Sequence, residues 1–290
     1  MSGSETDVLE DTIGLRRVMT MLETDKLFTG SIPENYDRYM VPLIFAPFAV
    51  DLAQRAASLS PGAVLEIAAG TGVVTRALAP KLSSDARYIV TDLNQSMLDY
   101  AASQQGFDDR LEWGQADALK LPFENAAFDL VLCQFGAMFF PNRIAGYREA
   151  KRVLKPGGHF LFNVWDRIEE NVFADDVTTA LAKMFPDDPP RFLVRTPHGY
   201  HDKALICTEL EEAGFSHVVI ETKAEQSRAS SPRIPALAYC QGTVLRSEIE
   251  ARAPGKLDVA TDYAASAIAA RHGDSEVAAK IQAHVIMAAA

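Results

Sequence analysis

The sequence predicts an α/β protein in which helices cover both faces of a doubly wound, mostly parallel sheet. Two observations lead to this fold class. Segments of strand length alternate with segments of helical periodicity between Pro61 and Trp165. Within that region, residues 64–75 read VLEIAAGTGVVT, an apolar run that passes through small residues into a helix. Because such alternation favours parallel strands joined by right-handed crossovers, we expect a Rossmann-like core.

Each element of this core follows from its own local pattern. We expect strands at residues 63–68, 87–92, 111–115, 128–133, 159–165 and 216–223. We expect helices at residues 47–58, 72–81, 96–103, 143–154, 166–185 and 202–213. The core is therefore expected to span residues 60–231, with an insertion at about 166–202, behind an N-terminal helical or lid segment in residues 1–59.

Residues 232–290 show only helical patterns. They predict helices at 235–250, 256–271 and 275–287. In the last of these, Val277, Ile281 and Val285 share one face. Since the core can close by about residue 224, we expect a helical C-terminal extension that the sheet does not need. Its apolar faces require a cover, so we expect it to pack near the segment around Tyr36, beside the substrate pocket, or to form a homodimer there.

Composition excludes several classes of function. The 290 residues carry a formal net charge of −11, which argues against a nucleic-acid groove and against docking on an anionic membrane. The three cysteines are far apart, without a C-x-x-C pair, and no H-E-x-x-H spacing occurs, so we expect neither a metal site nor disulfides. No apolar stretch approaches the roughly 18 residues of a membrane span. We therefore expect a cytoplasmic protein without an integral membrane segment.

The turn in residues 64–75 indicates a nucleotide-type ligand. Gly70 and Gly72 tolerate tight backbone turns, and the following helix directs unpaired N–H groups at whatever lies before it. The dinucleotide fingerprint G-x-G-x-x-G fails, because its third position is Thr75. Instead a carboxylate, Glu66, stands inside the strand, where a cationic, donor-rich ligand would offset the cost of its burial. The alternative is an ordinary strand–helix turn without a ligand.

Other polar residues follow the next strands, at the edge where doubly wound sheets bind ligands. Asp92 ends the second strand, where its carboxylate can accept hydrogen bonds from ribose hydroxyls or can cap a helix. Asp117 follows the third strand, where it can reach an adenine amino group or be an ordinary loop residue. The segment 133–141 begins over the centre of the expected crevice.

Three motifs resemble one enzyme family. Residues 66–72 look like the first motif of class I S-adenosylmethionine (SAM) methyltransferases, with Ala68 in place of the usual first glycine. Residues 121–129 (LPFENAAFD) and 149–158 (EAKRVLKPGG) are similar to signatures of the type 11 family, whose members include ubiquinone- and menaquinone-pathway methyltransferases. The resemblance covers residues 60–165 in order and spacing, and says little about the rest.

The resemblance implies a set of SAM-binding residues: Tyr36, Glu66, Ala68, Gly70, Gly72, Asp92, Leu93, Asp117, Ala118, Gln134 and Phe135. In the family, the glycine turn passes along the methionine portion of SAM and Asp92 holds the ribose. Leu93 stacks beside the adenine, whose edge meets Asp117 and Ala118. Gln134 or Phe135 lies near the sulfonium, and Tyr36 closes over the cofactor or packs in a lid helix.

Methyl transfer needs mainly alignment and the exclusion of water, although a carbon or phenol acceptor can require a base. The clustered candidates for a base are His198, Tyr200 and His201, of which His201 can instead form a helix start with Asp202. Met138, Phe139 and Phe140 can line an acceptor pocket or belong to the core.

These observations predict a SAM-dependent methyltransferase that acts on a small organic acceptor and releases S-adenosyl-L-homocysteine. A lipid or quinone-ring acceptor is the alternative within this class. An NAD(P)-dependent oxidoreductase is disfavoured by Glu66 and the missing third glycine. A SAM-binding module without catalysis is the third alternative, which turnover with an acceptor would exclude.

Overall fold

The computed structural model of the chain describes residues 34 and 36–290. Its strands are β1 (Ala63–Glu66), β2 (Arg87–Asp92), β3 (Leu111–Gln115), β4 (Phe128–Gln134), β5 (Leu154–Trp165), β6 (Ser216–Ala229) and β7 (Val277–Ala289). They form one sheet in the order β3-β2-β1-β4-β5-β7-β6. Strands β1 to β5 pair in parallel, whereas β7 runs antiparallel to both β5 and β6. The doubly wound, mostly parallel fold is confirmed.

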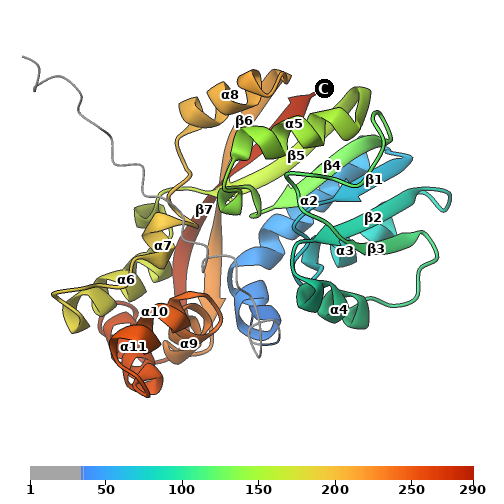
Figure 1. The fold of residues 1–290 in the computed structure, drawn as a ribbon. Helices are drawn as coiled ribbons and strands as arrows, with labels where there is room; N and C mark the ends of the chain where they lie inside the picture. The colour runs from blue at the N-terminus through green and yellow to red at the C-terminus, as the bar shows by residue number, and fades with distance from the viewer. Residues whose placement is uncertain (1–33, 35) are drawn as a thin grey trace, which may run out of the picture.

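Helices lie on both faces of this sheet (Figure 1). The α-helices are α2 (Ala46–Ser58), α3 (Val73–Leu78), α4 (Gln95–Gln104), α5 (Arg143–Val153), α6 (Val172–Met184), α7 (Phe192–Arg195), α8 (Lys203–Glu212), α9 (Arg233–Gln241), α10 (Leu245–Arg252) and α11 (Leu257–His272). The other helical segments are the π-type helix η2 (Tyr36–Phe45) and the short 3-10 helices η3 (Ala79–Lys81), η4 (Ala137–Phe139) and η5 (Ile168–Glu170).

The strand order fixes where a ligand can bind. From β1 the chain proceeds to β2 and β3 on one side, and then returns to β4 and β5 on the other. The loops after β1 and β4 therefore leave the sheet in opposite directions, and a crevice opens beyond their carboxyl ends. The glycine turn follows β1, and the aromatic segment after Gln134 follows β4, so both border this crevice.

The last expected helix, at residues 275–287, is wrong, because this stretch is strand β7. It lies between β5 and β6, and Ile286 is aligned with Phe162 on one side and Ile220 on the other. Most of its side chains are buried, as expected for a strand inside a sheet. The expectation that the sheet closes by residue 224 is therefore also wrong, since the chain's C-terminal strand completes it.

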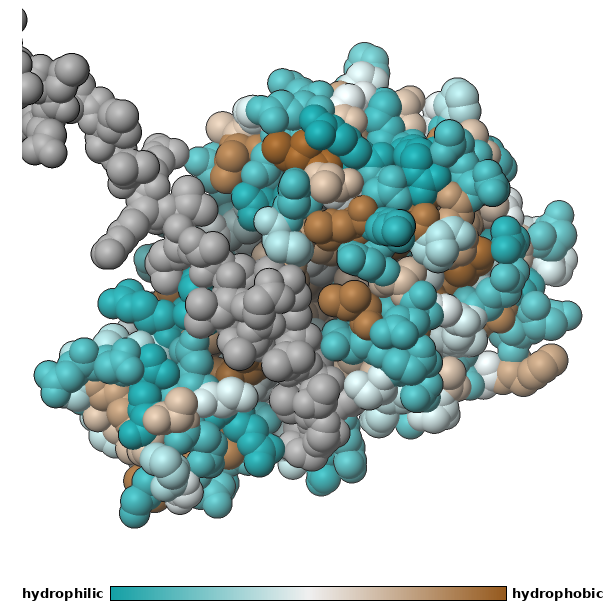
Figure 2. Space-filling model, viewed as in Figure 1, coloured by the Kyte–Doolittle hydropathy of each residue, from teal (hydrophilic) through white to brown (hydrophobic). Residues whose placement is uncertain are grey.

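The helical part of the C-terminal region forms a lobe beside the sheet. Helices α9 and α11 pack on one another and on α6, at the ends of the long strands β6 and β7 (Figure 1). The expected helix 235–250 is two helices, which meet at Gly242. A Cβ there would lie 2.6 Å from the carbonyl oxygen of Ala238, so only glycine fits. On the face seen in Figure 2, the described surface is mostly hydrophilic, with apolar residues in separate patches.

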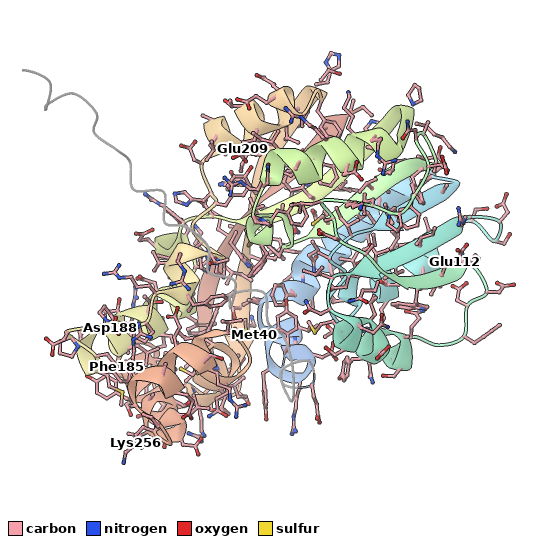
Figure 3. All side chains as sticks on the ribbon, in the orientation of Figure 1. Met40, Glu112, Phe185, Asp188, Glu209 and Lys256 are labelled. Carbon is pink, nitrogen blue, oxygen red and sulfur yellow. The ribbon has the colours of Figure 1, made fainter. Side chains whose placement is uncertain are left out.

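The N-terminal helices η2 and α2 join this lobe to the sheet. Helix α9 packs against η2, as expected for the C-terminal region, and Met40 lies at their junction (Figure 3). By length and composition Tyr36–Ser58 could cross a membrane, contrary to the expectation that no such stretch exists. In the structure 56% of its most apolar window is buried, and residues such as Phe48 and Leu52 pack in the core. This is the behaviour of a core helix.

Candidate functional site

A cleft opens beyond the carboxyl ends of β1, β2, β3 and β4. It holds about 900 Å³ of empty space, part of which is open solvent. Its lining comes from η2 and from the loops after these four strands. The lining residues are Tyr36, Ala68, Gly70, Asp92, Leu93, Asn94, Met97, Ala116, Asp117, Ala118, Leu119, Gln134, Phe135, Gly136, Phe139, Phe140 and Pro141.

The structure brings together most of the residues that the sequence singled out. Those that line the cleft are Tyr36, Ala68, Gly70, Asp92, Leu93, Asp117, Ala118, Gln134 and Phe135. Two others, Glu66 and Gly72, lie behind the turn rather than in the cleft. Phe139 and Phe140 also line it, whereas Met138 is buried in the core. The contact of each residue with SAM stays a prediction.

The glycine turn adopts left-handed backbone conformations at three positions. The φ angles are 53° at Ala68, 57° at Gly70 and 77° at Gly72. At Ala68 this conformation is disfavoured for a residue with a Cβ, at a cost of about 1 kcal/mol. Gly72 is the N-cap of α3, and a Cβ there would lie 3.0 Å from the Cβ of Ala101 in α4. Gly72 therefore serves the packing of the turn against α4.

Glu66 has protein partners, so its burial does not require a ligand, and its contact with SAM stays a prediction. Its carboxylate accepts a hydrogen bond of 2.7 Å from the Thr75 hydroxyl and a second from the Tyr88 hydroxyl. Burial raises the pKa of Glu66 to about 7, although both hydroxyl donors oppose that shift. The side chain thus holds β1, β2 and α3 together beneath the turn.

Asp92 ties the glycine turn to the end of β2. Its carboxylate oxygens accept hydrogen bonds of 2.8 Å from the backbone N–H of Gly70 and of 2.8 Å from that of Asn94. Burial raises the pKa of Asp92, while these backbone donors favour the charged form. The carboxylate lines the cleft, so its remaining lone pairs can accept hydrogen bonds from a ligand hydroxyl.

The end of β4 presents an amide oxygen and an aromatic ring. The Oε1 atom of Gln134 is buried and has no hydrogen-bond partner among the described residues. Phe135, with φ of 49°, is held through its backbone N–H by the side-chain oxygen of Asn163 at 2.9 Å. Its ring stacks on Trp165 with 3.8 Å between centroids. The unpaired acceptor on Gln134 indicates a ligand that donates a hydrogen bond there.

The chemistry of this lining fits SAM. Asp92, Asp117 and Gln134 offer oxygen acceptors to ribose hydroxyls, amino groups and a cation, while Leu93 and Met97 offer apolar contact. No lysine, arginine or histidine belongs to the lining among residues 34 and 36–290. Among the described residues a pyrophosphate would therefore meet backbone N–H groups and no cationic side chain.

The candidate bases lie outside the cleft. His198 is buried, its Nδ1 lies 2.9 Å from the backbone oxygen of Asp166, and burial lowers its pKa to about 4. The Tyr200 hydroxyl donates to Glu209 at 2.6 Å, and burial raises its pKa. His201 bonds to the backbone oxygen of His198 at 2.9 Å. These partners assign the group to the core and to the start of α8, so its catalytic role is not supported.

Some residues of the site were missed in the sequence. Asn94, Met97 and Leu119 line the cleft, but nothing in their local pattern marks them. Gly136 must be glycine, because a Cβ there would lie 2.5 Å from the Cβ of Ala68. Asn163 carried a usable signal, since it is the one amide in the apolar run FLFNVW and a buried amide needs a partner.

Comparisons with known proteins agree with this geometry. A family model described as a methyltransferase domain matches residues 65–162. The ubiquinone/menaquinone biosynthesis C-methyltransferase UbiE of Burkholderia vietnamiensis is 33% identical over 208 residues, which cover 65% of this chain and 82% of that protein. UbiE of Coxiella burnetii is 26% identical over 164 residues, covering 52% of this chain and 66% of that protein. The chain thus spans slightly less than two thirds of the Coxiella relative.

A solved structure shares the fold. Phosphoethanolamine N-methyltransferase 2 of Haemonchus contortus, determined with phosphomonomethylethanolamine and S-adenosylhomocysteine, matches with a TM-score of 0.57. Sequence identity is 17%, and the match covers 89% of this chain and 57% of that chain. At this identity the likeness concerns the fold alone.

Proposed function

This chain belongs to the SAM-dependent methyltransferases of the type 11 family, and from that premise we propose that it methylates a neutral, largely apolar small molecule. The nucleophile of the acceptor attacks the methyl carbon of the sulfonium, and the carbon–sulfur bond breaks with its electron pair remaining on sulfur. S-adenosyl-L-homocysteine is the second product, and the acceptor loses a proton.

The observation that carries the proposal is the lining of the cleft. Its oxygen acceptors are Asp92, Asp117 and Gln134, and no basic side chain accompanies them among the described residues. Asp92 would receive the ribose hydroxyls of SAM and Gln134 an N–H of its methionine portion. In-line transfer then requires only that an acceptor lie against the methyl group in a site shielded from water.

The apolar part of the cleft supports an apolar acceptor. Phe139, Phe140 and Pro141 line it, and Phe139 leads toward Phe192 of the helical insertion at 6.5 Å between ring centroids. A phosphate-bearing acceptor would need cationic donors, which the lining does not supply among the residues that the structure describes. A ring compound with apolar substituents matches these side chains better.

A quinone-type ring is the more specific candidate. The relatives named UbiE are C-methyltransferases of ubiquinone and menaquinone biosynthesis, and the aromatic lining suits a reduced quinone ring. The lining contains no histidine in the described part of the chain, so the acceptor would supply its own nucleophile. The hydroxyl groups of a hydroquinone make its ring carbons nucleophilic, so a hydroquinone meets this requirement.

Incubation with methyl-labelled SAM and a set of acceptors tests the proposal. We expect label in a prenylated hydroquinone or a similar apolar phenol, and none in phosphoethanolamine. The protein that transfers the label should also bind SAM and should not bind NAD. Transfer to phosphoethanolamine alone would contradict the apolar acceptor, and SAM binding without transfer to any acceptor would favour a non-catalytic module. The homodimer and the cytoplasmic location remain predictions, which light scattering and cell fractionation test.

A further inference from the structure

We propose that the ion pair between Asp37 and Arg76 is a clasp that holds η2 over the cleft and sets how long SAM and its product stay bound. The proposal rests on the proposed function, since it takes SAM as the occupant. Asp37 and Arg76 are positioning residues, which act through the neighbouring side chain of Tyr36.

The clasp joins the N-terminal helix to the glycine turn. Nη2 of Arg76 lies 2.9 Å from Oδ1 of Asp37, and Nη1 of the same guanidinium donates to the backbone oxygen of Thr71 at 2.5 Å. Thr71 lies between Gly70, which lines the cleft, and Gly72. One arginine therefore holds both η2 and the turn along which the cofactor would lie.

A second helix at the cleft also contacts Asp37. The hydroxyl of Tyr100 in α4 lies 3.4 Å from Oδ2 of Asp37, at the limit of a hydrogen bond. The same helix contributes Met97 to the cleft lining. Asp37 thus meets α3 and α4, the helices that follow the two strands bearing the turn and Asp92.

Tyr36 connects the clasp to the cleft. Its side chain lines the cleft, and its ring stacks on Phe45 at 5.0 Å between centroids. The ring of Phe45 in turn lies 5.5 Å between centroids from the ring of Phe135, which also lines the cleft. Burial, and then the carboxylates of Asp92 and Asp37, raise the pKa of Tyr36, so its hydroxyl stays protonated beside Asp92.

These contacts imply a kinetic role. A ligand held between Tyr36 and Asp92 leaves when η2 moves away, and that movement breaks the ion pair. The two side chains are 19% and 27% exposed, so solvent weakens the pair without abolishing it. Ion pairs of this exposure contribute only a modest interaction free energy. We therefore expect the clasp to slow ligand dissociation about fivefold. Salt screens such a pair, so high ionic strength should speed dissociation in the wild-type protein.

The test is the dissociation rate of S-adenosylhomocysteine, measured by displacement with excess SAM in stopped flow. Asp37→Asn removes the charge, keeps the shape and leaves the bond from Arg76 to Thr71 in place. We expect dissociation about fivefold faster than in the wild type, and less sensitive to salt. The matched control is Glu209→Gln, because Arg143–Glu209 has similar exposure, joins α5 to α8, and contributes nothing to the cleft lining.

A second experiment repeats the substitution in a protein that lacks the Tyr36 side chain, and tests whether the clasp acts through Tyr36. In a Tyr36→Ala protein, Asp37→Asn should produce no further acceleration. Two results would overturn the clasp. One is that S-adenosylhomocysteine dissociates from Asp37→Asn at the wild-type rate. The other is that Asp37→Asn speeds dissociation equally in the wild type and in Tyr36→Ala. Wild-type protein that binds neither SAM nor its product would overturn the proposed function instead, so the two failures are distinguishable.

Discussion

Two buried carboxylates lie at the carboxyl ends of neighbouring strands and have different environments. Glu66 accepts hydrogen bonds from hydroxyl groups, and Asp92 accepts them from backbone N–H groups aligned by the turn. Only Asp92 lines the cleft. Glu66 is thus suited to hold the strands together, and Asp92 to bind a ligand while it fixes the turn.

Glu66 makes stability depend on pH. Its pKa is about 7 in the folded protein against an ordinary 4.5, so between these values the unfolded chain loses the proton that the folded chain keeps. The contribution of Glu66 to stability is therefore full below pH 4.5 and falls as pH rises to about 7, by roughly 3 kcal/mol. His198, whose pKa burial lowers to about 4, contributes a slope of the opposite sign, so the wild type must be compared with the variant. Glu66→Gln should remove the contribution of Glu66 in urea unfolding at pH 5 to 8. Glu112→Gln, at an exposed carboxylate, should retain it; an unchanged slope in Glu66→Gln would contradict the assignment.

Asp92→Ala should weaken SAM binding by about 2–4 kcal/mol, because charge-assisted hydrogen bonds to the ribose are lost. The change also frees the N–H groups of Gly70 and Asn94, so thermal unfolding must first establish that the protein is folded. Asp92→Asn keeps the shape and one acceptor, and we expect an intermediate loss. Calorimetry with an unchanged dissociation constant in both variants would exclude the ribose contact.

Gly136→Ala should destabilise the protein by about 1–3 kcal/mol, since the new methyl group overpacks the base of the cleft. The added Cβ would lie 2.5 Å from the Cβ of Ala68 and 2.8 Å from the sulfur of Cys133. Ala68→Gly removes the first of these contacts, so the double variant should recover part of the loss in a urea titration. Purely additive effects of the two changes would show that the residues do not touch.

At the scale of elements, a helix or strand can be predicted from the sequence where the pattern that defines it is local. The predicted bounds of strands β1 to β4 agree with the structure to within two residues, because each strand has its own apolar run and turn, whereas β5 begins at Leu154 rather than at residue 159. The sequence predicts a helix where strand β7 lies, because Val277, Ile281 and Val285 are four residues apart, a spacing that places residues on one face of a helix and also of a strand. Its pairing with β5 and β6, which decides the matter, is a property of the fold.

The same distinction applies to the candidate site. The positions that follow strand ends were found, since the order of strands and turns places them at one edge of the sheet. The sequence offers the cluster at His198 only as a candidate base, and the fold buries His198 against the backbone oxygen of Asp166, outside the cleft. The local pattern marks Asn163 as a buried amide, but its partner, the backbone N–H of Phe135, depends on contacts between strands.

At the scale of the whole molecule, the C-terminal strand joins the cofactor half to the rest. Strand β7 pairs with β5, whose end carries Trp165 beneath the cleft residue Phe135, and with β6, which extends toward the helical lobe. The sheet is therefore incomplete until the last residues of the chain are in place. Without β7, strand β6 would lose its partner and β5 would become an exposed edge.

A chain that ends at Gly273 should therefore fail to form the SAM site, although every cleft residue is present.

Ile286→Asp offers a milder test. The side chain of Ile286 is fully buried between Phe162 and Ile220. An unpaired carboxylate there should lower the free energy of unfolding by more than about 4 kcal/mol, a large share of a domain's stability. Lys280→Gln, at an exposed position of β7, is the control and should change stability little. Circular dichroism, urea unfolding and SAM calorimetry on the three proteins measure these effects. If the shortened chain binds SAM with the wild-type dissociation constant, the parallel strands suffice for the site and β7 serves the helical lobe alone.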